Sequence, residues 1–192
     1  MATTVRTLLV ALLVAALAAP AAADARHHHR HKVSARAVQA CPDADLEPTS
    51  GNLARIRAAI LCLHNQIRVE HHLPRLREHK RLRKAAVGHS RDMVRKRYFE
   101  HTSPSGRTMV DRILAARYVR EDQGWSLGEN LEWGTGPLAT PHGAMDAWMH
   151  SAGHRANILT RSFRELGVGA VIGVPLSDAP GATFTVDFGV RR

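Results

Sequence analysis

The chain carries the segment Trp148-Met149-His150-Ser151-Ala152-Gly153-His154-Arg155-Ala156-Asn157-Ile158-Leu159, which holds two imidazoles, an arginine and a glycine. Its pattern predicts a helix over residues 142–150 with Trp148 facing inward. Gly153 is expected to break that helix, because glycine is a poor helix former, before a short turn of helix that runs to Leu159. We therefore expect this segment to form the floor of a functional site.

Two upstream segments add groups of the same kind. They are Tyr98-Phe99-Glu100-His101-Thr102-Ser103-Pro104 and Leu127-Gly128-Glu129-Asn130. With His154 they offer His101 and Glu129 as candidate site residues. Neutral imidazoles and a carboxylate are ligands for Zn²⁺ and similar divalent metals, and the same groups act as general acid and base near neutral pH. The residues alone leave both chemistries open.

These segments occur together with further motifs, in one order along the chain: Leu61-Cys62-Leu63-His64-Asn65-Gln66-Ile67-Arg68, His89-Ser90-Arg91-Asp92-Met93, Glu165-Leu166-Gly167-Val168-Gly169 and Asp187-Phe188-Gly189. The combination resembles the CAP superfamily of cysteine-rich secretory proteins, antigen 5 and pathogenesis-related proteins, also called SCP domains, and within it the bacterial secreted branch. The resemblance covers about residues 53 to 190 and implies a single-domain α-β-α sandwich.

The resemblance also implies a cleft lined by two histidines and two glutamates. This chain matches three of them, with His101, Glu129 and His154. The fourth position, three residues after Trp148, is Ser151 here. Three ligands with an open position are still enough for a metal, but the missing carboxylate lowers the expected affinity. The His150–His154 pair has the spacing of a zinc-protease motif, yet Ser151 stands where that motif has its general base.

Hydrophobic periodicity predicts an α+β domain. A first helix is expected to open at the N-cap Ser50, a second spans 78–97 and a third 105–118. A strand is predicted over 127–133 and a hairpin over 166–174 and 182–190. His64 and His89 fall on inward helix faces and are interpreted as core histidines. Asp111 and Arg112 are interpreted as an exposed or interface pair.

The N-terminal region predicts export. Residues 1–23 have the charged start, apolar run and small-residue site of a signal peptide, with cleavage after Ala23 or Ala25. An uncleaved anchor is the alternative, although the apolar run is shorter than the roughly 20 residues that span a bilayer. We divide the rest into a basic, His-rich tail and loop over 24–52, and the domain over 53–192. Cys41 and Cys62, the only cysteines, are expected to form a disulfide.

The formal net charge is +10, which favours polyanionic partners but also fits a bias toward arginine codons. The leading interpretation is a secreted or cell-envelope module, monomeric, that binds a lipid, sterol, peptide or cell-wall polymer without established catalysis. A metal-assisted, peptidase-like hydrolase is one alternative. A basic, polyanion-binding adhesion factor is another.

Overall fold

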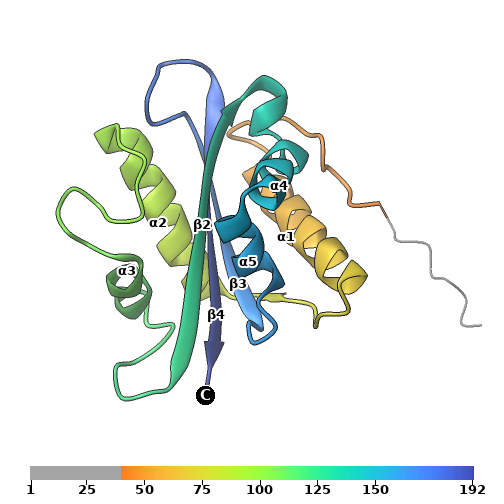
Figure 1. Cartoon of the computed structure of the whole chain (residues 1–192). Helices are drawn as coiled ribbons and strands as arrows, with labels where there is room; N and C mark the ends of the chain where they lie inside the picture. The colour runs from red at the N-terminus through yellow and green to blue at the C-terminus, as the bar shows by residue number, and fades with distance from the viewer. Residues whose placement is uncertain (1–39) are drawn as a thin grey trace, which may run out of the picture. The chain divides into compact units, whose positions relative to one another are not determined.

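The computed structural model describes residues 40–192, and in this range one four-stranded sheet lies between two layers of helices (Figure 1). The helices are α1 Leu53–Glu70, α2 Lys80–Lys96, α3 Met109–Ala115, α4 Pro141–His150 and α5 Ala152–Leu159, with a short 3₁₀ helix, η1, at Gly136–Ala139. The strands are β1 Arg77–Glu78, β2 Trp125–Thr135, β3 Glu165–Ile172 and β4 Gly181–Arg191. This arrangement confirms the predicted α+β sandwich.

The sheet has the order β1-β3-β4-β2, so β2 is an edge strand. Strand β4 pairs antiparallel with both β2 and β3, which confirms the predicted hairpin, while β1 pairs parallel with β3. The two-residue strand β1 was not predicted, because so short a segment has no periodicity to detect.

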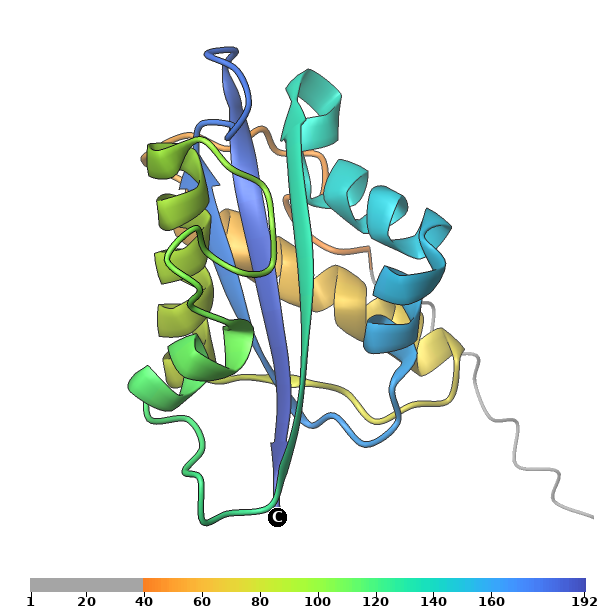
Figure 2. The ribbon, with the colours of Figure 1, turned by 60° about the vertical axis from the view of Figure 1, so that its left-hand side comes forward.

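Alternation along the strands separates the two faces of the sheet. One face carries apolar side chains that pack with Trp148 of α4 and with Ile56 and Ile60 of α1; from the strands these are Leu166, Val168, Ala170, Phe184, Val186 and Phe188. Figure 1 shows α1, α4 and α5 on one side of the strands and α2 and α3 on the other, and Figure 2 shows the same elements turned by 60°.

The second face brings α2 unusually close to the sheet. A Cβ atom at Gly169 of β3 would overlap the carbonyl carbon of Ala86, and one at Gly167 would overlap the amide nitrogen of Arg83. The missing side chains therefore let the backbone of α2 lie against β3. In this position Ser90 donates a hydrogen bond to Thr185 Oγ1 over 2.8 Å.

Three predicted element boundaries were wrong. Helix α1 begins after Asn52 rather than Ser50, and Asn52 Oδ1 accepts a hydrogen bond from the amide of Thr49. Helix α3 is shorter than predicted, because Thr108 and Asp111 form a capping box that starts it at Met109. The break between α4 and α5 is at Ser151, whose backbone is extended, and Gly153 lies inside α5.

Cys41 and Cys62 form a disulfide with a Cα–Cα distance of 5.7 Å, as predicted, and it ties residues 41–52 to α1. The predicted signal peptide and almost all of the His-rich tail lie outside the described residues. Over residues 40–192, none of the helices combines the length and the apolar character that a membrane crossing requires.

Candidate functional site

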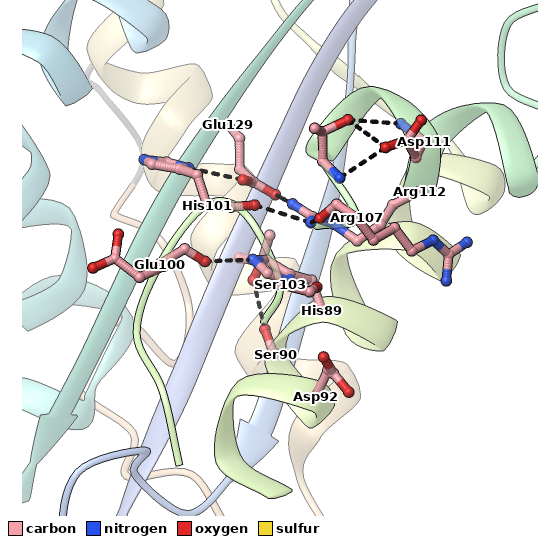
Figure 3. Close-up of polar contacts among 12 residues, drawn as sticks. His89, Ser90, Asp92, Glu100, His101, Ser103, Arg107, Asp111, Arg112 and Glu129 are labelled. Carbon is pink, nitrogen blue, oxygen red and sulfur yellow. Dashed lines mark hydrogen bonds and ion pairs between the residues drawn. The ribbon is translucent and has the colours of Figure 1, made fainter. Parts of the chain in front are cut away.

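The candidate site is built on a buried carboxylate, Glu129 of β2, whose two oxygens have different partners (Figure 3). Oε1 accepts a hydrogen bond of 2.8 Å from Nδ1 of His101, and Oε2 accepts one of 2.7 Å from Nη2 of Arg112. The Glu129 side chain is 2% exposed and that of His101 is 56% exposed. An imidazole is thus held at the surface by a charge network beneath it.

Arg112 corrects the prediction for residues 111 and 112. Its side chain is only 5% exposed and contributes to the site, while Asp111 caps α3. Besides Glu129, its Nη1 group donates to the backbone carbonyls of His101 and Arg107, over 3.0 and 3.2 Å. Arg112 therefore fixes both the carboxylate and the loop that carries His101.

The network shifts the pKa values of its members in opposite directions. Burial acts to raise the pKa of Glu129, but the hydrogen bond from His101 and the charge of Arg112 outweigh it, so this pKa is lowered. The hydrogen bond to Glu129 raises the pKa of His101 despite some desolvation. An ionised Glu129 therefore favours the imidazolium form of His101.

A second buried acid, Asp187 of β4, lies directly opposite Glu129 in the strand register. It is fully buried, and burial together with the charge of Glu129 raises its pKa well above the usual range. Asp187 is therefore protonated beside an ionised neighbour. The sequence placed Asp187 on the polar side of an alternating strand, but the alternation carried no sign that this side would be covered by α2.

His154 comes to the same edge of the sheet from the opposite layer. Its backbone carbonyl accepts a hydrogen bond from Asn130 Nδ2 over 3.0 Å, and Asn157 Nδ2 donates to the Glu129 carbonyl over 3.1 Å. Desolvation is the larger and the charge of His101 the smaller of two causes that lower the pKa of His154. The edge strand β2 thus contacts the loop that contains His101 in one layer and helix α5, which contains His154, in the other.

The fit of this site to a metal ion is limited by the partners of Glu129. Both of its oxygens already accept hydrogen bonds, and Ser151 is the extended residue between α4 and α5. Among residues 40–192, no three or more His, Cys, Asp or Glu side chains form a group that could hold a metal ion. Metal coordination by His101, Glu129 and His154 stays a prediction.

His64 and His89 are buried core histidines, as predicted. Nδ1 of His64 donates to the carbonyl of Ile60 over 2.8 Å, and Nε2 of His89 donates to the carbonyl of Glu100 over 3.0 Å. Burial is the largest cause that lowers both pKa values, each to about 4. Both rings are therefore neutral at pH 7.

Comparison with known proteins gives a consistent picture. The cysteine-rich secretory protein family, CAP, matches residues 61–188. Two relatives come from Bacillus subtilis. The uncharacterized membrane protein YlbC is 34% identical over 110 residues, and the match covers 57% of this chain and 30% of YlbC. The uncharacterized protein YkwD is 38% identical over 90 residues, and the match covers 47% of this chain and 32% of YkwD. The chain thus spans about a third of the length of these relatives.

Two solved structures share the fold. An extracellular protein with an SCP domain from Bacillus anthracis has a TM-score of 0.59 and 30% identity, covering 76% of this chain and 44% of that one. An outer surface protein from Borrelia burgdorferi has a TM-score of 0.56 and 20% identity, and the match covers 76% of this chain and 96% of that protein. The second likeness is one of fold alone.

Proposed function

Because this chain belongs to the cysteine-rich secretory protein (CAP) family, we propose that it is an extracellular or cell-envelope binding module whose recognition group is the His101 imidazole. The B. anthracis relative of similar fold is described as extracellular, which supports that location. The ligand we expect is a peptide or a cell-wall polymer, since both offer hydrogen-bond acceptors to an imidazolium.

The observation that carries this proposal is the contrast in exposure along one chain of hydrogen bonds. Glu129 and Arg112 are almost completely buried, while His101, at the end of the chain, is more than half exposed. Buried ion pairs contribute little net stability, because desolvation offsets the attraction between the charges. Their effect here is to orient an exposed ring and to favour its protonated form, which is the preorganisation that a binding site requires.

Binding is tested with soluble peptidoglycan fragments by isothermal titration calorimetry. His101→Ala is expected to weaken binding at least about tenfold, since one charge-assisted hydrogen bond contributes about 1.5–3 kcal/mol. His71→Ala, an exposed histidine at the end of α1, is the matched control and should change binding less than about twofold. Equal affinities for the parent and His101→Ala would refute the proposal.

Incubation of the same peptidoglycan fragments with the protein distinguishes binding from the peptidase-like alternative. Fragments recovered after hours with the protein should keep their masses. Time-dependent cleavage that His101→Ala abolishes would replace the binding module with a hydrolase.

A weak metal site is the second candidate, and one observation favours it. When Nδ1 of His101 donates to Glu129, Nε2 is the atom left for a ligand, and a carboxylate behind a histidine is the usual arrangement at metal sites. His101 Nε2 and His154 would hold the ion, with Glu129 orienting the first ring.

Zinc is the probe for this second candidate, with a protein that begins at Ala40 so that the His-rich run is absent. An ion that binds only the folded state stabilises it by about 2.7 kcal/mol at a hundredfold excess over Kd. Zinc should raise the Tm of this protein at pH 7.5, and His101→Ala and His154→Ala should each abolish the rise, whereas His71→Ala should keep it. If the double histidine variant responds like the parent, no metal binds at this site.

A further inference from the structure

A recessed site lies on the α2–α3 side of the sheet, and His101, Glu129 and His154 are not among its lining residues. A cavity of about 530 Å³ opens there, a size typical of small-molecule sites. Five cationic side chains and one acidic side chain line it: Lys84, Arg95, Lys96, Arg107, Arg112 and Asp92. Asp92 already accepts hydrogen bonds from Tyr98, Arg95 and Lys96.

Two of the cations have no counterion within the described part of the chain. Among residues 40–192, Lys84 and Arg107 form no ion pair, whereas Arg95 and Lys96 pair with Asp92 and Arg112 pairs with Glu129. Lys84 is on α2, and Arg107 is on the loop between α2 and α3. An excess of positive charge therefore remains at this cavity, and it would be neutralised by an anionic ligand.

Buried polar atoms in the cavity wall also lack partners. Nε of Arg112 and Nδ1 of His89 are inaccessible and make no hydrogen bond within residues 40–192, although both residues line the cavity (Figure 3). Nε of Arg112 is a donor, and Nδ1 of His89 is an acceptor because Nε2 donates to Glu100. Unpaired buried polar atoms are rare in folded proteins. Because neither atom is exposed to the cavity, a ligand there meets the charges of Lys84 and Arg107 and not these two atoms.

The backbone of α2 leaves room for such a ligand. Gly88 lies in the cavity wall in the middle of α2, and a Cβ atom there would meet no atom within 4 Å. Glycine inside a helix destabilises it by about 0.5–1 kcal/mol relative to alanine. Neighbouring atoms therefore do not require glycine at this position, and a larger side chain there has room to enter the cavity.

We infer that this cavity binds a small phosphate ester, with the phosphate beside Lys84 and Arg107. A phosphate oxygen matches the forked donors of arginine and the ammonium of lysine.

Isothermal titration calorimetry of the full chain with glycerol phosphate, at constant ionic strength, tests this site. Gly88→Leu places the side chain of a good helix former in part of the cavity, so the Tm should stay the same or rise while affinity falls at least about tenfold. Lys84→Gln/Arg107→Gln should reduce affinity to a similar extent. Arg75→Gln/Arg91→Gln removes two positive charges that do not line the cavity, and it should change affinity less than about twofold.

The two pairs of charge substitutions separate a defined site from general attraction. Equal losses in both pairs, or full affinity in a folded Gly88→Leu variant, would show binding to the basic surface as a whole and overturn the inference. No heat of binding with the parent protein would overturn it as well. If Gly88→Leu fails to fold, the comparison of the two charge pairs decides.

Discussion

Glu129 accepts hydrogen bonds from His101 and Arg112 and lies opposite Asp187, so its substitution tests the whole network. Glu129→Gln can still accept from His101 but cannot neutralise Arg112, so an uncompensated guanidinium stays buried. We expect the free energy of unfolding to fall by about 3–5 kcal/mol. The pKa of His101 should fall as well, because the carboxylate that raises it is gone. Urea denaturation and an NMR titration of the His101 ring measure the two effects.

Glu132→Gln is the matched control for this prediction. Glu132 lies on the same strand, and among residues 40–192 it forms no ion pair; burial raises its pKa. This variant should change stability by less than about 1 kcal/mol and leave the pKa of His101 unchanged. Similar losses of stability in both variants would show that the Glu129 network has no special role.

His64 makes stability depend on pH. Its folded-state pKa of about 4 lies below the unfolded value, so the unfolded chain binds the proton first as the pH falls. The contribution of His64 is therefore complete above about pH 6.5 and is lost between about pH 6.5 and 4, by up to about 3 kcal/mol. In His64→Leu this part of the loss should disappear, as urea unfolding at pH 7 and pH 4.5 would reveal. A parent and variant with parallel pH profiles would contradict the prediction.

At the scale of elements, the contact between α2 and β3 positions the site. Gly169→Val places a side chain against the backbone of Ala86 and Val87, which α2 can relieve only by moving away from the sheet. We expect a loss of more than about 2 kcal/mol in the free energy of unfolding. We also expect a change in the environment of His89 that NMR can detect.

Gly88→Ala is the control within α2. Its new methyl group meets open space, so the variant should gain up to about 1 kcal/mol from helix propensity. Gly169→Val and Gly88→Ala together therefore distinguish a glycine that close packing requires from one that it does not. Equal effects of the two substitutions in the same direction would refute this distinction.

At the scale of the whole molecule, the disulfide limits the freedom of the segment before α1. Cys41 and Cys62 are 21 residues apart, and closing a loop of this size constrains the unfolded chain by about 3 kcal/mol. Cys41→Ala/Cys62→Ala should lose a similar amount, as thermal or urea unfolding would show. Reductant should lower the stability of the parent and leave that of the variant unchanged; freely alkylated cysteines in the unreduced protein would contradict the bond itself.

The sequence by itself determined the fold class, most of the elements and the disulfide. Periodicity and turn residues are local signals, and two cysteines allow only one pairing within the chain. Family motifs also selected His101, Glu129 and His154, although spacing alone left their chemistry open between metal binding and acid–base roles. Element boundaries were less certain, because the capping box at Thr108 depends on short-range hydrogen bonds that compete with several neighbouring candidates, and α1 begins after Asn52 without a side-chain cap.

Only the tertiary structure decided the partners of those residues. Arg112 was interpreted with Asp111 as an exposed or interface pair, yet the packing of α3 directs it to Glu129, which lies 17 residues away in the chain. Asp187 looked like the polar side of a strand, yet the two glycines of β3 let α2 cover it. A pKa depends on burial and on charges that meet through space, and neither is encoded at one position in the chain. The sequence therefore identified the imidazoles, whereas packing shifted their pKa values and formed the basic cavity on the α2–α3 side.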